Sequence, residues 1–191
     1  AKAKALKPGK AGLWFAEASI ALRDERPDDA ISLLNEGLRL DPKNAGAYFD
    51  LGNARVMQSD LKKALKAFER ATTIKPSFWE ALNNQALVLF EMGDIAEAIK
   101  RWRSVLAIKR NPEPMLALAA ALNQQTPGDA ESIELASKAL AEDPNYVLPG
   151  HQQNQLWGSK LRQATDVLLT TPSLRGAVER AEANADPKSA E

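Results

Sequence analysis

A repeat of 34 residues is the feature that most constrains this chain. Five columns of residues recur at that spacing, and most columns keep one size class, either large and apolar or small. The columns are Trp14, Tyr48, Leu82 and Leu116; Ala18, Gly52, Ala86 and Ala120; Ala30, Ala64, Ala98 and Ser132; Leu34, Phe68, Trp102 and Ala136; Gly37, Ala71, Val105 and Ala139. Pro42, Pro76 and Pro144 close the units at one and two periods, and Pro112 lies two residues late. Such a period predicts stacked units, because each buries its apolar face on its neighbours.

Each unit is predicted to be a pair of antiparallel helices joined by a tight turn. Apolar residues follow helical spacing on both sides of short breaks at residues 26–29, 59–60, 93–94 and 126–129. The third unit has the clearest signals. Gly93 suits the end of one helix, and Asp94 with Glu97 three residues later forms a capping box for the next.

The period, the large and small columns and the closing prolines resemble the tetratricopeptide repeat (TPR). The resemblance implies an all-α fold, a right-handed superhelical α-solenoid of four helix-turn-helix units plus C-terminal capping helices. The expected units are 11–44, 45–78, 79–112 and 113–146, followed by capping helices over 147–184. Residues 1–10 are expected to be a basic flexible segment, and 185–191 a flexible tail. The aromatics in the repeat columns (Trp14, Tyr48, Phe68 and Trp102) are expected in the core.

Composition disfavours several classes of partner. Lys plus Arg and Asp plus Glu number 25 each, so the net field does not favour nucleic acid. No run approaches the ~18 apolar residues of a membrane helix. The first residue is Ala, which favours a processed or truncated chain, so membrane contact is expected only through a segment outside this sequence. The basic clusters at Lys62, Lys63 and Lys66 and at Arg101 and Arg103 are interpreted as solvated surface of second helices.

No enzyme is expected. Cysteine is absent and His151 is the single histidine, with no recognisable nucleophile motif beside it. The sequence has no phosphate-binding loop and no metal-binding histidine pair. The carboxylate pairs Asp28–Asp29 and Glu142–Asp143 lie beside expected helix ends, where N-terminal capping explains the first pair and a repeat-closing Asp-Pro turn contains the second. We therefore predict no catalytic residue, no metal site and no cofactor.

In TPR proteins the first helix of each unit lines a concave groove that holds a peptide, and the resemblance carries this expectation to matching positions here. The predicted groove residues are Phe15, Ser19, Arg23, Phe49, Asp50, Asn53, Met57, Asn83, Asn84, Leu87 and Phe90, with Ala117, Ala121, Gln124 and Gln125 in the fourth unit. Phe15, Phe49 and Phe90 lie outside the repeat columns and are interpreted as anchors for apolar side chains. Asn53, Asn83 and Asn84 are expected to hydrogen-bond the peptide. Alternatively, the chain's own C-terminal helix fills this face.

The predicted function is a protein-interaction scaffold that binds an apolar or amphipathic partner segment. The basic side chains with which chaperone-adaptor TPR domains hold a terminal carboxylate are not at the matching positions, which disfavours chaperone tails as ligands. The alternative is a membrane-tethered assembly factor for photosynthetic complexes or pigment enzymes, because residues 156–162 and 174–180 look similar to C-terminal extensions of cyanobacterial and plastid TPR proteins. The expected compartment is the cytoplasm, or alternatively the thylakoid or another membrane. Self-association through the C-terminal helices is a further expectation.

Overall fold

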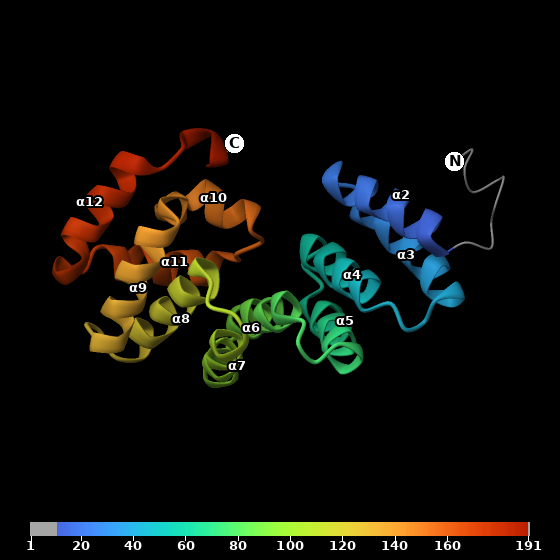
Figure 1. The fold of residues 1–191 in the computed structure, drawn as a ribbon, viewed down its shortest axis with the longest axis horizontal. Helices are drawn as coiled ribbons and strands as arrows, with labels where there is room; N and C mark the ends of the chain where they lie inside the picture. Colours follow the sequence, from blue (N-terminus) through green and yellow to red (C-terminus); the bar gives the residue numbers. More distant parts are fainter. Residues whose placement is uncertain (1–10, 191) are drawn as a thin grey trace. The chain divides into compact units, whose positions relative to one another are not determined.

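The computed structural model describes residues 11–190, and the basic segment expected over 1–10 lies outside them. The described residues form helices and turns, with no strand among them (Figure 1). The chain divides into two compact units, 1–85 and 86–191. The first contains α2 (Ala11–Arg23), α3 (Pro27–Leu40), α4 (Ala45–Met57), α5 (Leu61–Ile74) and the start of α6 (Trp79–Met92). The second continues with α7 (Ile95–Ile108), α8 (Pro112–Gln125), α9 (Ala130–Glu142), η1 (Pro144–Val147), α10 (Pro149–Asn154), α11 (Ser159–Leu169), η2 (Pro172–Leu174), α12 (Arg175–Asn184) and η3 (Pro187–Ala190).

Short polar side chains start the helices where the repeat pattern breaks. Asn44, Asp60, Asp94 and Asp129 each accept a hydrogen bond from a backbone N–H in the first turn of α4, α5, α7 and α9. These bonds satisfy donors that have no partner within the helix. Gly93 precedes α7 with a φ of +92°, a left-handed conformation that glycine adopts without strain. The cap predicted at Asp94 is confirmed, and Asp60, expected only within a turn, is also a cap.

The small columns let the paired helices approach each other. Ala18, Ala86 and Ala120 are fully buried. At Gly52 of α4 a Cβ atom would overlap the ring of Phe68, which lies on α5 and is itself fully buried. The large residue of one helix therefore fills the space left by the small residue of the other, which fixes their separation at close-packed density.

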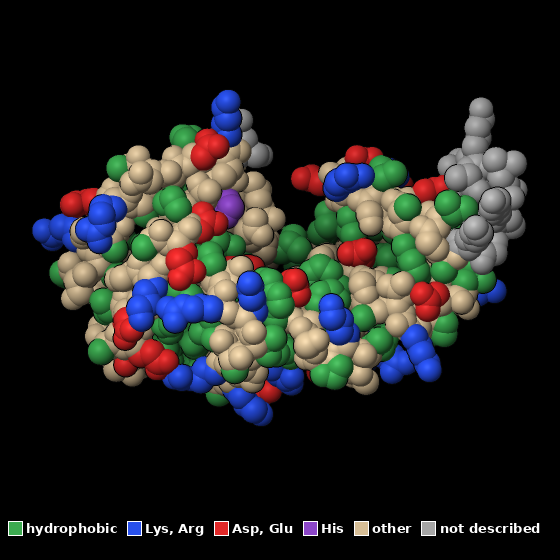
Figure 2. Space-filling model, viewed as in Figure 1, with side chains coloured by type: hydrophobic (Ala, Val, Ile, Leu, Met, Phe, Trp, Pro, Cys, Tyr) green, Lys and Arg blue, Asp and Glu red, His purple; other side chains and the backbone are tan. Residues whose placement is uncertain are grey.

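Two of the four aromatics in the repeat columns are core residues, one in each unit. Phe68 and Trp102 are 0% exposed, as predicted, whereas Trp14 and Tyr48 are half-buried. The basic residues beside them stay at the surface and pair with carboxylates, Arg101 with Glu97 among them. On the face shown in Figure 2, Lys and Arg side chains are interspersed with Asp and Glu. Neither sign of charge dominates that face.

The C-terminal helices cover the last helix pair of the second unit, as the fold prediction requires. α11 packs against α8 through Leu161, Thr165 and Leu168, all fully buried, and α12 packs against α9 (Figure 1). Val167 lies outside this buried stripe of α11 and is 60% exposed. Within the stretch expected as a tail, the N–H of Asp186 donates to Asn145 Oδ1.

Candidate functional site: first-helix faces and a cavity under α11

The eleven predicted groove residues all lie on the first helices of their pairs. α2 carries Phe15, Ser19 and Arg23; α4 carries Phe49, Asp50, Asn53 and Met57; α6 carries Asn83, Asn84, Leu87 and Phe90. Their environments differ widely. Ser19 and Arg23 are exposed, whereas Asn83, Leu87 and Phe90 are buried at 1%, 4% and 2% exposure.

The three phenylalanines take part in helix packing, contrary to their expected role outside the packing register. A Cβ atom at Gly37 of α3 would overlap the Phe15 ring, so Phe15 lies against its partner helix. The centroid of the Phe49 ring is 5.8 Å from that of Phe68 and 5.2 Å from that of Phe78. The repeat columns record only the most regular contacts, and these rings fill the remaining space between helices. Their truncation is therefore expected to lower stability.

An amide pair joins α4 and α6 within the first unit. Asn84 Nδ2 donates to Asn53 Oδ1 at 2.9 Å, and Asn83 Nδ2 donates to Asn84 Oδ1 at 3.4 Å. Because Asn53 Oδ1 is the acceptor, its Nδ2 remains a donor, and no described residue accepts a hydrogen bond from it. Asn53 is half-buried, so this donor can reach a ligand on the first-helix face.

Asp50 lies one helical turn before Asn53 and is the acidic group of this face on α4. Its carboxyl is half-buried and has no hydrogen bond or ion pair with any residue of 11–190. Burial raises the pKa of Asp50 to about 6, because the charged form loses hydration that nothing replaces. An unpartnered carboxyl of this kind is a place where a ligand donor gains a bond.

We expect Asp50→Asn to stabilise the protein at pH 7.5 and not at pH 4. The folded-state pKa of Asp50 lies above its ordinary 3.8, so the penalty for burying the carboxylate appears as pH rises from about 4 through 6. The full shift corresponds to roughly 3 kcal/mol, and residual solvent contact reduces the expected gain to about 1–2 kcal/mol. Urea unfolding at both pH values measures it. Asp166→Asn, at an exposed carboxyl of α11, is the control, and an equal gain at both pH values contradicts the prediction.

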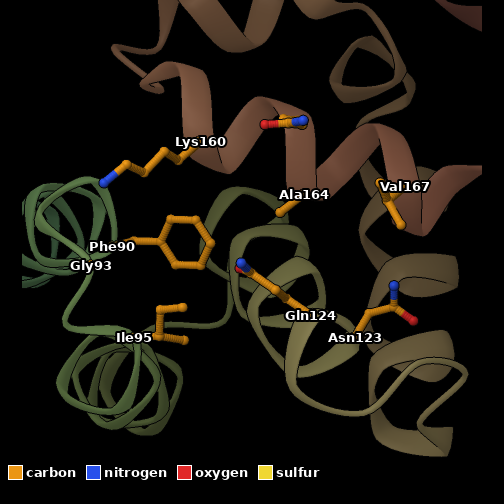
Figure 3. Close-up of a pocket in the computed structure, with 9 residues that line it drawn as sticks. Phe90, Gly93, Ile95, Asn123, Gln124, Lys160, Ala164 and Val167 are labelled. Atoms are coloured by element: carbon orange, nitrogen blue, oxygen red, sulfur yellow. The ribbon is translucent and has the colours of Figure 1, made fainter.

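The second unit contains a cavity of about 480 Å³ beneath α11 (Figure 3). The lining comes from the end of α6, the turn before α7, the end of α8 and one side of α11: Phe90, Gly93, Ile95, Asn123, Gln124, Lys160, Gln163, Ala164 and Val167. Phe90 packs against Trp102 with ring centroids 5.9 Å apart and also lines the cavity. Of the predicted first-helix residues, the cavity brings together Phe90 and Gln124. Helical spacing could not have found the α11 residues, because nothing local places them there.

Asn123 contributes a donor without a partner to this cavity. Its side chain is 4% exposed, and the backbone N–H of Gly128 donates to its Oδ1 at 2.9 Å. That bond fixes the orientation of the amide, since an N–H needs the oxygen as its acceptor. Asn123 Nδ2 donates to no described residue, and Figure 3 shows it turned toward Val167 on α11.

Glu91 holds α11 above the cavity. Its carboxylate accepts the backbone N–H of Lys160 at 3.3 Å and that of Leu161 at 2.9 Å, and Lys160 Nζ donates to the Glu91 carbonyl at 2.6 Å. α11 has no side-chain cap of its own, so Glu91 satisfies its first donors from 69 and 70 residues away. A Cβ atom at Gly158 would overlap the Glu91 side chain, so the glycine leaves room for this contact.

His151 packs edge-on to Tyr146 with ring centroids 4.8 Å apart. Burial raises the pKa of Tyr146. No three described His, Asp or Glu residues are placed to hold a metal ion. No helix within 11–190 is long and apolar enough to span a membrane.

Comparison with known proteins identifies the repeat. A family model described as tetratricopeptide repeat matches residues 15–77, which span most of α2 and all of α3, α4 and α5. Residues 15–77 are tetratricopeptide repeats. Superkiller complex protein 3 of Mus musculus is 25% identical over 103 residues, which is 54% of this chain and 7% of that protein's length.

Two solved structures share the fold of this protein. The crystal structure of MamA matches with a TM-score of 0.67 at 24% identity, covering 74% of this chain and 82% of MamA. The crystal structure of YrrB, described as a TPR protein with an unusual peptide-binding site, matches with a TM-score of 0.66 at 17% identity. That match covers 95% of this chain and 96% of YrrB. The paired helices of a TPR array support a protein-interaction scaffold.

Proposed function

We propose that this protein is a non-catalytic scaffold whose first helices bind an apolar or amphipathic segment of a partner protein. The observation that carries the proposal is the amide pair of Asn53 and Asn84. Asn53 Nδ2 has no partner among the described residues and lies on the face that TPR domains present to peptides. A peptide carbonyl that accepts from Asn53 Nδ2 replaces its contact with solvent. The described peptide-binding site of YrrB supports peptides as the ligand class.

The same face supplies further ligand contacts within the first unit. Asp50 accepts from a peptide N–H or a basic side chain, and half-buried Met57 provides adaptable apolar surface near the end of α4. Phe49 contributes mainly by holding α4 against Phe68 and Phe78, and not by entering the partner. The membrane-tethered assembly factor and the self-association inferred from the sequence stay predictions.

Asn53→Asp tests the proposal with little change in packing. The aspartate keeps the oxygen that accepts from Asn84 but loses the free donor. Twelve-residue peptides selected from a displayed random library on the intact chain serve as probes, with affinities measured by fluorescence anisotropy. We expect Asn53→Asp to weaken selected peptides about 3–10-fold, the worth of one hydrogen bond. Asn35→Asp, the same change on the exposed side of α3, is the matched control. Failure to enrich any peptide, or equal affinity for both variants and the parent chain, contradicts the proposal.

A further inference from the structure

The cavity beneath α11 has the composition of a site for one large apolar side chain. Its volume of about 480 Å³ lies within the range of small-ligand pockets. Phe90 and Ile95 form one side, Ala164 and Val167 the other, and most of the lining is apolar (Figure 3). Val167 remains 60% exposed although it is β-branched and apolar, because it borders this opening. A side chain of leucine or phenylalanine size would remove that surface from water.

The polar part of the lining includes a hydrogen-bond donor that a ligand acceptor can satisfy. Asn123 is almost fully buried, and its Nδ2 is a donor that no described residue satisfies. Nδ2 itself keeps contact with solvent, so it borders the open space of the cavity, where a ligand oxygen can accept from it. Gln124 and Gln163 are exposed at the rim and can bond a main chain that passes there.

The charge of the lining selects an anionic acceptor. Lys160 is the one charged residue among those that line the cavity. One N–H of its ammonium group donates to the carbonyl of Glu91, and the other two are available as donors. The Glu91 carboxylate nearby is already bonded to the N-terminus of α11 and Asp94 to that of α7, so neither needs a ligand cation. A ligand carboxylate at the cavity mouth is therefore attracted by the charge of Lys160, whereas a basic ligand group there is repelled by it.

We propose that this cavity binds a partner segment in which a large apolar side chain is followed by an acidic residue. The apolar side chain lies between Phe90 and α11, the carboxylate accepts from Lys160 Nζ at one end of the cavity, and a main-chain carbonyl of the segment accepts from Asn123 Nδ2 at the other end (Figure 3). The inference rests on the proposed scaffold function and assigns it a partner chemistry in the second unit. Glu91 has a positioning role, since it sets the height of α11 above Phe90.

Blocking the cavity tests the proposal directly. Ala164→Phe places a ring in the space from the α11 side, where Ala164 is half-buried and lines the opening. The probes are synthetic twelve-residue peptides that carry Leu-Glu, Ala-Glu, Leu-Gln or Leu-Lys at the centre of one common sequence. We expect the Leu-Glu peptide to bind at least tenfold more tightly than Ala-Glu or Leu-Lys and about threefold more tightly than Leu-Gln. Ala164→Phe should abolish these differences while leaving the melting temperature unchanged or raised.

Two further variants test the polar contacts separately. Asn123→Asp keeps the acceptor for Gly128 and removes the donor, and Lys160→Met removes the charge but keeps an unbranched stem. Each should weaken the Leu-Glu peptide about 3–10-fold, and Lys138→Met on α9 is the matched control. Equal binding of all four peptides, or full affinity in Ala164→Phe, overturns the proposal. So does a concentration-dependent dimer, seen by sedimentation, that Ala164→Phe dissociates. Peptides that lose affinity in Asn53→Asp but not in Ala164→Phe leave the proposed function standing and remove this inference alone.

Discussion

A chain that ends at Pro144 is expected to aggregate or to melt at least 10 °C below the intact protein. The deletion removes Trp157, Leu161 and Leu168, which are 2%, 0% and 0% exposed. It uncovers the face of α8 on which α11 packs and breaks the bond from Trp157 Nε1 to Glu113. Burial of each such side chain contributes about 1.5–3 kcal/mol, a large share of a typical net stability of about 5–15 kcal/mol. Exposed apolar surface of this kind also favours association.

Thermal melting and light scattering of the shortened chain measure this effect. Val167→Ser in the full-length chain is the control, because it changes α11 on its 60% exposed side without opening the α8 contact. A shortened chain that stays monomeric, soluble and equally resistant to heat shows that the C-terminal helices are not a structural cover.

Trp102→Ala is expected to cost about 3–5 kcal/mol of unfolding free energy. The indole is fully buried on α7 and contacts the ring of Phe90, so its removal leaves a cavity that the surrounding helices cannot close completely. The loss of support for Phe90 should also widen the space beneath α11. Urea unfolding followed by circular dichroism measures the change in free energy.

Trp79→Ala provides the comparison for this substitution. Trp79 begins α6 and is half-buried, so its truncation should cost clearly less than that of Trp102. Equal losses at the two positions mean that the repeat column does not mark the packing core, contrary to the interpretation of the 34-residue columns.

The helix pairs could be predicted because their causes are local or periodic. Gly52 and Phe68 lie on consecutive helices within one unit, and a small residue opposite a large one is a pattern that sequence spacing can reveal. The same holds for the cap at Asp94, which accepts from a residue three positions ahead. Such contacts depend on residues that are near in the chain, so a single sequence carries enough information to find them.

The roles of the phenylalanines could not be read in the same way. Phe90 was expected to be an accessible anchor because no repeat column contains it, yet it is 2% exposed and pairs with Trp102. Phe49 likewise packs against Phe78 from the loop before α6. A repeat column identifies the positions at which each unit has a small or a large residue. It does not show which side chains fill the space between helices in one particular unit.

The sequence alone determined that this protein is a series of helix pairs with a helical C-terminal cover, because period, caps and amphipathic pattern act over a few turns of chain. The tertiary structure decided where a partner's side chain has room. Glu91 caps α11 across 69 residues, and that bond places Ala164 and Val167 opposite Phe90. Nothing in the local pattern of either segment specifies the other, because the contact forms only when α11 has packed against α8.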